Sequence, residues 1–353
     1  METLSFSGSE AALARLIKSH MDELGYDAFI DEAGNVIGKT GVGKPRVLLC
    51  GHMDTVSGEL PVTFDGEVLA GRGSVDAKGP LAALIMGGAA AVENGFTGSL
   101  IVTGVVDEEA SNRGILRLIE HGFDVDYAVF GEPTNVDTIT MGYKGSVLIE
   151  VDVETPEGHS SAPWVYGNAI EKAMELYWGI KEAAASLTGE REGINALTAS
   201  IRGISGGGSH GVSPSHCRLW IEFRVPTGIT VDHLLETVNK QVKGFTSQDT
   251  VIGLEVTDRV EPYTADRKNG LVKAFTRSIY SQTGSRVTLV RKSGTGDMNY
   301  YGAATDTPCV TYGPGDPHLD HTPHERIQIV DYLRSIEVIK QALLLLPATL
   351  QMV

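Results

Sequence analysis

The sequence predicts an α/β protein with a smaller α+β unit inserted into its chain. In residues 1–142, short apolar runs alternate with helical segments, which is typical of strands and helices packed in layers. From Tyr143 onward the strands alternate apolar with polar residues, as in a sheet that exposes one face to water. The first pattern returns near Leu271. We therefore expect one domain from residues 1–142 and 262–353, and a second domain from residues 143–261.

Three near-continuous apolar runs predict strands of the larger domain, at residues 47–50, 100–106 and 127–130. Such runs suit strands that are buried on both faces, as in a parallel sheet. Between the first two runs, residues 80–95 begin with Pro and end with Asn-Gly, which are start and stop signals of a helix. Another helix is expected close to the end of the chain, at residues 329–345.

The inserted domain is predicted to have the element order β-α-β-β-α-β. Its first strand is residues 147–153, where apolar and polar residues alternate. This order is that of a ferredoxin-like unit, a small sheet with helices on one face. The other five elements are expected at residues 169–185, 196–204, 217–225, 231–242 and 251–256.

The composition is that of a globular protein. The chain has 353 residues, of which 42% are hydrophobic and 21% charged, and this length suggests about two domains. The formal net charge of −16 argues against a nucleic-acid partner, because contacts to phosphates need a surplus of lysine and arginine.

The cysteines and the apolar runs of the sequence indicate the cellular compartment in which the protein is expected. Cys50, Cys217 and Cys309 are too few and too scattered for a disulfide framework or a cysteine-type zinc site, so we expect buried, reduced thiols. We find no signal peptide in the first residues, and the longest apolar runs are shorter than the roughly 20 residues that a membrane span needs. We expect a cytoplasmic protein.

Charged residues follow the predicted strands of the larger domain, at the point where each strand ends. Ligands of open α/β sheets bind at the carboxyl ends of strands, so we expect these side chains to meet at one edge. Without a cation, so many acidic groups would repel each other. Imidazole and carboxylate are usual ligands of a divalent transition metal, zinc above all, which predicts a metal site. The residues are His52, Asp76, Glu108, Glu109 and Glu132.

Each of these residues alone also has a purely structural interpretation. Asp76 before a helix is a good N-cap. Residues 107–109 alone would form a solvated loop, and Glu132 before a proline would lie in a turn. The joint placement at several strand ends favours the metal site. His321, late in the chain, is a candidate ligand of a second ion.

Residues 38–44 match the first seven positions of a phosphate-binding loop. The eighth position is Pro45, so the hydroxyl that binds magnesium is missing. The following residues 46–50 also predict a strand rather than the required helix. We therefore interpret the segment as a hairpin turn.

Six motifs in order resemble a known family. Each is weak alone, but together they are specific and extend over essentially the whole chain. The family is that of the two-zinc amidohydrolases and exopeptidases, which includes acetylornithine deacetylase, succinyl-diaminopimelate desuccinylase, carboxypeptidase G and aminoacylase. The resemblance implies a zinc-exopeptidase-like catalytic domain with an inserted lid and dimerisation domain, and hence a homodimer. The motifs are residues 7–10, 51–56, 71–79, 107–109, 131–134 and 321–323.

The resemblance also implies two divalent ions, zinc foremost and cobalt as an alternative. Asp76 would bridge them. His52 and Glu132 would complete one site, and Glu109 and His321 the other. His318 and His324 compete with His321 for the ligand role, and the alignment of the motif favours His321.

Further roles follow from the same resemblance. Glu108 would be the general base, and Asp54 would hold the imidazole of His52 and fix its tautomer. In the lid, His159 would steady the oxyanion in the partner subunit's site and Arg224 would bind the substrate carboxylate. The loop with Gly294 and Thr295 resembles a substrate loop. One departure is Gly211, where many relatives carry Asn.

Within the family, residues 292–299, residues 143–145 and the short chain look most like the branch that releases lysine or ornithine from an amino-group carrier protein. That branch cuts the γ-glutamyl conjugate in lysine and arginine biosynthesis. Small N-acyl amino acids are alternative substrates, as for acetylornithine or acetyl-lysine deacetylase, succinyl-diaminopimelate desuccinylase or a dipeptidase. A non-catalytic metal- or peptide-binding relative is a further alternative. An acidic carrier would need basic residues to meet, and the candidates are Arg224, Arg259, Arg267, Arg291 and Lys292.

Overall fold

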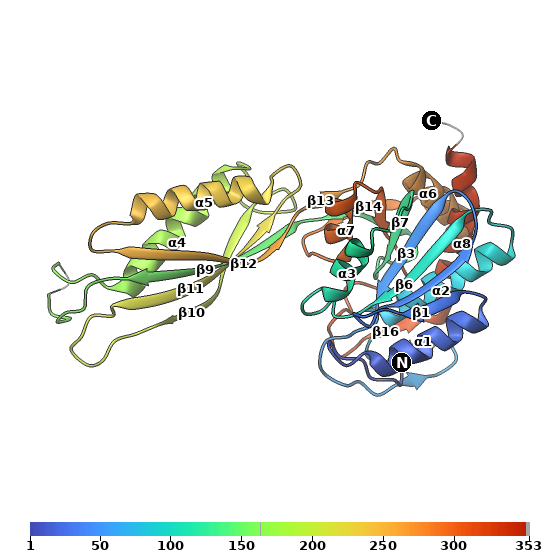
Figure 1. Ribbon diagram of the computed structural model, residues 1–353, viewed down its shortest axis with the longest axis horizontal. Helices are drawn as coiled ribbons and strands as arrows, with labels where there is room; N and C mark the ends of the chain where they lie inside the picture. The colour runs from blue at the N-terminus through green and yellow to red at the C-terminus, as the bar shows by residue number, and fades with distance from the viewer. Residues whose placement is uncertain (163, 351–353) are drawn as a thin grey trace. The chain divides into compact units, whose positions relative to one another are not determined.

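The computed structural model describes residues 1–162 and 164–350, and the chain in it forms two compact units (Figure 1). Within the described residues, the larger unit consists of residues 1–142, 264–291 and 296–350, and the smaller of residues 143–263 and 292–295. The short return of Lys292–Thr295 to the smaller unit was not expected. It places Gly294 and Thr295 outside the larger unit.

A mixed sheet organises the larger unit, with the strand order β1-β2-β6-β3-β7-β15-β8-β13 and β14 paired to β8. The predicted apolar runs are the central strands β3, β6 and β7, which pair in parallel, and β15 pairs in parallel with β7. This confirms the parallel, buried centre. The strands are β1 (Asp27–Ile30), β2 (Val36–Gly41), β3 (Arg46–His52), β6 (Ser99–Val105), β7 (Tyr127–Gly131), β8 (Thr138–Tyr143), β13 (Tyr263–Thr264), β14 (Thr288–Lys292) and β15 (Cys309–Thr311).

Helices cover both faces of this sheet. Consecutive residues of a strand point to opposite faces, and β7 shows both contacts. A Cβ on Gly131 would lie 2.7 Å from Leu84 of α2 (Lys78–Glu93). The ring of Phe130 lies 5.9 Å from that of Tyr301 in α7 (Asp297–Thr305). The fold is therefore the predicted layered α/β arrangement. The other helices of this unit are α1 (Ala11–Glu23), α3 (Arg113–His121), α6 (Gly270–Thr283) and α8 (Ile329–Leu350).

The hairpin interpretation of residues 38–44 is wrong. The strands on either side, β2 and β3, do not pair with each other, because β6 lies between them. Ser99 of β6 is opposite both Gly41 of β2 and Arg46 of β3. The connecting loop therefore passes over the end of a strand that comes from much later in the chain. The loop is followed by the strand β3 rather than by a helix, which agrees with our rejection of a phosphate site.

The larger unit also contains a small three-stranded sheet. It has the order β16-β5-β4, formed by β4 (Thr63–Phe64), β5 (Val68–Ala70) and β16 (Arg326–Gln328). Because β5 and β16 are far apart in sequence, their pairing brings two distant loops of the larger unit together.

The smaller unit has the predicted β-α-β-β-α-β order. Its antiparallel sheet has the order β10-β11-β9-β12, and α4 and α5 pack on one face over a core that includes Val151 and Phe223. Both features agree with a ferredoxin-like unit. The elements are β9 (Gly145–Glu154), α4 (Ala169–Ser186), β10 (Thr198–Gly206), β11 (His216–Val225), α5 (Val231–Phe245) and β12 (Val251–Val260).

Two other expectations concern the whole chain. Cys50, Cys217 and Cys309 are buried and unpaired, as predicted. Over residues 1–162 and 164–350, we find no helix with the length and apolar character needed to cross a membrane.

Candidate metal centre

The strand ends of the larger unit bring the predicted ligands together. His52 is the last residue of β3, Glu132 directly follows β7, and Glu109 follows β6. These three strands are parallel neighbours, so their carboxyl ends meet at the same edge of the sheet. Asp76 reaches this edge from the loop before α2, and His321 from the loop before β16.

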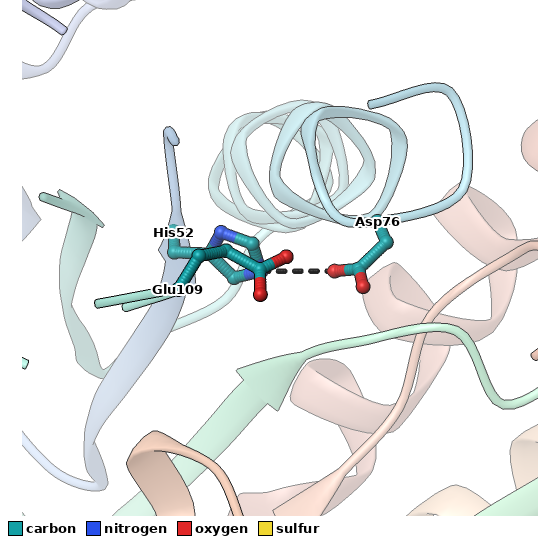
Figure 2. Close-up of side chains that lie close together, drawn as sticks. All are labelled: His52, Asp76 and Glu109. Atoms are coloured by element: carbon teal, nitrogen blue, oxygen red, sulfur yellow. Dashed lines mark hydrogen bonds and ion pairs between the residues drawn. The ribbon is translucent and has the colours of Figure 1, made fainter. Parts of the chain in front are cut away.

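The carboxylate of Asp76 lies between two histidines. Its Oδ1 is 3.0 Å from Nε2 of His52, and its Oδ2 is 3.0 Å from Nε2 of His321. Figure 2 shows the side chains of His52, Asp76 and Glu109 directed toward one another. One oxygen of Asp76 thus faces each histidine, which is the arrangement of a carboxylate shared between two ions.

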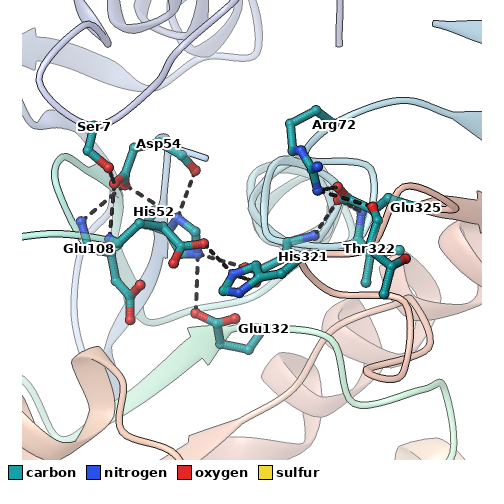
Figure 3. A network of polar contacts seen from close by, with 12 residues as sticks. Ser7, His52, Asp54, Arg72, Glu108, Glu132, His321, Thr322 and Glu325 are labelled. Carbon is teal, nitrogen blue, oxygen red and sulfur yellow. Dashed lines mark hydrogen bonds and ion pairs between the residues drawn. The ribbon is translucent and has the colours of Figure 1, made fainter. Parts of the chain in front are cut away.

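Each histidine has a second carboxylate beside it. Oε1 of Glu132 is 3.5 Å from Nε2 of His52 (Figure 3). Oε1 of Glu109 is 2.8 Å from Nε2 of His321. The side chains therefore form two donor sets that share Asp76. We name them the strand-end set (His52, Glu132, Asp76) and the loop set (Glu109, His321, Asp76).

The spacing of these donors fits divalent ions. Two ligands held about 2.0–2.2 Å from a zinc ion in a tetrahedral arrangement stand roughly 3.4 Å apart. The donor atoms of His52, Asp76 and Glu109 all lie within 4.8 Å of one another. The contacts of 2.8–3.5 Å within the two sets need only small adjustments to accept an ion. The nitrogen and oxygen donors suit zinc, cobalt or manganese.

Of the three late histidines, His321 is the one whose ring contacts the other candidate ligands. The backbone amides of His318 and His324 donate to the side chains of Asp316 and Thr322 in turns of the same loop. His321 itself has a positive φ of 58°. This uncommon backbone conformation directs its side chain toward Asp76 and Glu109.

Asp54 has two roles beside the centre. Nδ1 of His52 is 3.0 Å from the backbone carbonyl of Asp54 and 3.4 Å from its carboxylate, so Nδ1 carries the proton and Nε2 is left for an ion. The carboxylate of Asp54 also accepts the backbone N–H groups of Glu108 and Glu109 and the hydroxyl of Ser7. The sequence suggested the first role. The second, which positions the loop of residues 107–109, was not expected.

The carboxyl group of Glu108 is suited to carry a proton. Burial raises its pKa well above the ordinary value, and the neighbouring carboxylates of Asp297, Glu132 and Glu109 raise it further, against the opposing effect of His52. A carboxyl group with a raised pKa accepts a proton more readily than an ordinary surface carboxylate, as a general base must. A Cβ on Gly296 would lie 3.6 Å from Oε1 of Glu108, an ordinary contact distance, so the start of α7 lies beside this carboxyl group.

Asp297 is a buried residue near this centre that the sequence did not single out. Burial raises its pKa to about 7. Its Oδ1 has no hydrogen-bond partner among the described residues. Asp297 begins α7 and adds negative potential near Glu108.

The other predicted site residues belong to the smaller unit. Nδ1 of His159 is 2.8 Å from the hydroxyl of Ser161, and the side chain is exposed. Arg224 donates to Glu222 at 2.8 Å. Gly211 has a positive φ of 79°, and its carbonyl accepts the N–H of Ser160, so it shapes the turn next to His159. Asn tolerates a positive φ better than most residues, so this backbone conformation suits both the Gly of this chain and the Asn of many relatives.

The suggested basic surface is partly neutralised within the smaller unit. Arg224 is paired with Glu222, and Arg259 with Asp232 at 2.8 Å and Glu261 at 2.6 Å. These two cations therefore offer less positive charge to a carrier protein than the sequence suggested.

Proton release should accompany metal binding. Burial would lower the pKa of His52, but Glu132, Asp54 and Asp76 raise it well above 6.5. The hydrogen bond to Asp76 and the charge of Glu109 raise the pKa of His321 to about 9. With a pKa of about 9, the imidazole of His321 is protonated at pH 7.5 without metal and must lose that proton to bind an ion.

We expect chelator-treated protein to release at least one proton, that of His321, on binding metal at pH 7.5. The affinity of the loop set for metal should rise with pH up to about pH 9, where His321 becomes neutral. Calorimetric titration in buffers of different ionisation enthalpy measures the number of protons. Metal binding without proton release at this pH would contradict His321 as a ligand.

Known proteins resemble this chain over almost its full length. The family model described as peptidase family M20/M25/M40 matches residues 48–345. A relative from Pyrococcus abyssi, named as a LysW-lysine/LysW-ornithine hydrolase, is 36% identical over 97% of this chain and 90% of its own. A LysW-lysine hydrolase from Deinococcus radiodurans is 33% identical, and the match covers 96% of this chain and 92% of that relative. The solved structure of a tripeptidase from Staphylococcus aureus matches with a TM-score of 0.80 at 20% identity. This match covers 98% of this chain and 95% of the tripeptidase.

Proposed function

Because the chain belongs to peptidase family M20/M25/M40, we propose that it is a metal-dependent amide hydrolase that releases lysine, ornithine or both from a carrier-protein-linked γ-glutamyl conjugate. The observation that carries this proposal is the carboxylate of Asp76 shared between two donor sets, with Glu108 beside them. The names of both relatives specify a LysW-linked substrate, which agrees with the carrier conjugate that the sequence suggested. The reaction belongs to lysine and arginine biosynthesis.

Two divalent ions, zinc foremost and cobalt as an alternative, would be held by the strand-end set and the loop set. When bound, such paired ions polarise the amide carbonyl and make water more acidic. Glu108 takes the proton of the attacking water and returns it to the leaving amine, a step worth about 10²–10⁴-fold in rate. Asp54 keeps Glu108 in place through the backbone of residues 108 and 109.

The smaller unit would act as the lid and dimerisation domain, from residues 143–261. In it, Arg224 would bind the substrate carboxylate, because a guanidinium can bind a carboxylate with two hydrogen bonds. His159 would donate to the oxyanion in the partner subunit's site, and Gly294 and Thr295 would line the substrate. The enzyme would act in the cytoplasm as a homodimer. Size-exclusion chromatography with light scattering that finds only a monomer at active concentrations would remove His159 from this role.

The test of the function is amine release by chelator-stripped protein reloaded with zinc or cobalt. The substrates are the γ-glutamyl-lysine and γ-glutamyl-ornithine carrier conjugates, N-acetyl-lysine, N-acetyl-ornithine and N-succinyl-diaminopimelate. Metal-dependent release from the carrier conjugates is expected. Release from a small acylated amino acid instead would make the protein a deacetylase or desuccinylase with the same centre. Metal binding without any release would favour the binding-only alternative.

A further inference from the structure

A buried ion pair joins the loop of Asp76 to the loop of His321. Nη1 of Arg72 lies 2.9 Å from Oε2 of Glu325. The side chain of Glu325 is 0% exposed and that of Arg72 is 10% exposed. Arg72 stands four residues before Asp76, and Glu325 four residues after His321. We name this pair the Arg72–Glu325 clamp, and Figure 3 shows it beside Thr322.

The second oxygen of Glu325 holds the backbone at the bridging carboxylate. Oε1 of Glu325 accepts the N–H of Val75 at 2.9 Å and the N–H of Asp76 at 3.0 Å. Both oxygens of this buried carboxylate are therefore used, one by the guanidinium and one by the backbone of Asp76. The clamp thus fixes the backbone from which the Asp76 side chain projects.

Arg72 also holds the other loop directly. Its Nη1 donates to the carbonyl of Thr322 at 3.3 Å, and its Nε donates to the carbonyl of Gly58 at 3.0 Å. Thr322 is the residue after His321, so the guanidinium contacts the backbone next to that ligand. A planar guanidinium can make these contacts at once because its donors point in fixed directions.

The two donor sets differ in what supports them. His52 and Glu132 come from the ends of adjacent strands in the parallel sheet, whose hydrogen-bond ladder fixes them. His321 comes from a loop, and its side chain is 51% exposed. The loop set therefore depends on contacts outside the sheet, and the clamp supplies buried ones.

We infer that Arg72 and Glu325 are positioning residues that selectively hold the ion bound by the loop set, Glu109 and His321 with Asp76. This inference rests on the two-ion centre proposed above. The clamp fixes the relative position of Asp76 and His321, which come from loops far apart in sequence. Without it, Asp76 and His321 would lose their fixed spacing, so the loop set would lose the positions of two of its three donors. The strand-end set would keep His52 and Glu132 in place and would be affected only through Asp76. Residues that orient metal ligands in this way typically change metal affinity by about 10–100-fold.

The test is the Glu325→Gln variant. A glutamine has the same size, but its amide cannot accept from the backbone of Asp76 and from Arg72 at once, because one of its two ends is a donor. Chelator-stripped protein is titrated with Co²⁺ by calorimetry and by the visible absorption of bound cobalt. We expect one ion to bind with an affinity within about 3-fold of the wild type and the other to bind about 10–100-fold more weakly.

The His321→Ala variant shows which of the two ions stays tightly bound in Glu325→Gln. It removes a ligand of the loop set, so the ion that it retains reports the strand-end set. The tightly bound ion of Glu325→Gln should have the same cobalt spectrum and affinity as the ion retained by His321→Ala. Arg326→Ala is the matched control, since Arg326 is exposed, lies in the same segment and donates to the carbonyl of His324. It should bind both ions as the wild type does.

Equal weakening of both ions, or two ions bound as in the wild type, would overturn the inference. Thermal unfolding of the metal-free variants checks that the fold is intact. If Glu325→Gln does not fold, Arg72→Lys carries the same test, because lysine keeps the charge but loses the contacts to Thr322 and Gly58. A wild type that binds fewer than two ions would instead contradict the two-ion proposal.

Discussion

Replacing Glu108 with glutamine should abolish most turnover while both metal ions stay bound. The glutamine keeps the size of the side chain but cannot accept a proton from water or return one to the amine. General acid–base catalysis is worth about 10²–10⁴-fold, so kcat should fall by about that factor. Amine release at saturating substrate measures kcat, and elemental analysis of the purified protein measures the bound metal.

A surface glutamate provides the control for this variant. Glu120 lies on α3, is 68% exposed and pairs with Arg117 at 3.2 Å. Glu120→Gln should have the wild-type kcat. A Glu108→Gln enzyme with nearly unchanged kcat would exclude Glu108 as the base. A variant that has lost its metal would show that Glu108 acts as a ligand instead.

Replacing Asp76 with asparagine should weaken the binding of both ions together. Its two oxygens face His52 and His321 at 3.0 Å each, whereas an amide offers one oxygen and a nitrogen that cannot bind metal. Burial would raise the pKa of Asp76, but hydrogen bonds to His321 and His52 hold it below the ordinary value, so wild-type Asp76 is charged at neutral pH. We expect both affinities to fall by more than the roughly 100-fold that an outer residue can cost.

Variants of ligands that belong to only one donor set show whether the loss of both ions is specific to Asp76. Glu109→Gln should weaken one ion and Glu132→Gln the other, as calorimetric titration of each stripped variant would show. Asp22→Asn is the control, since Asp22 pairs with Lys18 on the surface at 2.7 Å. An Asp76→Asn protein that keeps one ion at wild-type affinity would mean that Asp76 serves a single site.

The strands at the centre of the site could be predicted because their signals are local. Each of β3, β6 and β7 contains an apolar run of a few residues, and a histidine or carboxylate lies at its end or shortly after it. Parallel strands bring such residues to one edge whatever the order of the strands. His52, Glu109 and Glu132 could therefore be placed together without knowledge of the sheet order.

Features that depend on pairing between distant segments could not be predicted. The loop after β2 resembles a hairpin in sequence, and only the insertion of β6 between β2 and β3 shows otherwise. Glu325 is a single acidic residue in a loop, and its burial depends on Arg72 and on the pairing of β16 with β5. One missed contact did have a local signal. Glu222 and Arg224 lie two residues apart on a strand and so share one face.

The position of β15 has a consequence for synthesis of the protein on the ribosome. This strand lies between β7 and β8, although it is made long after both. Until it emerges, the nascent chain carries an open slot in its main sheet, and an unpaired strand edge can pair with another chain. The continuous segment Tyr143–Tyr263 can fold during that interval. His321 follows β15 by ten residues, so the last of the proposed ligands is synthesised just after the strand that fills this slot. The proposed metal centre therefore cannot be completed before the strand that fills this slot has been synthesised.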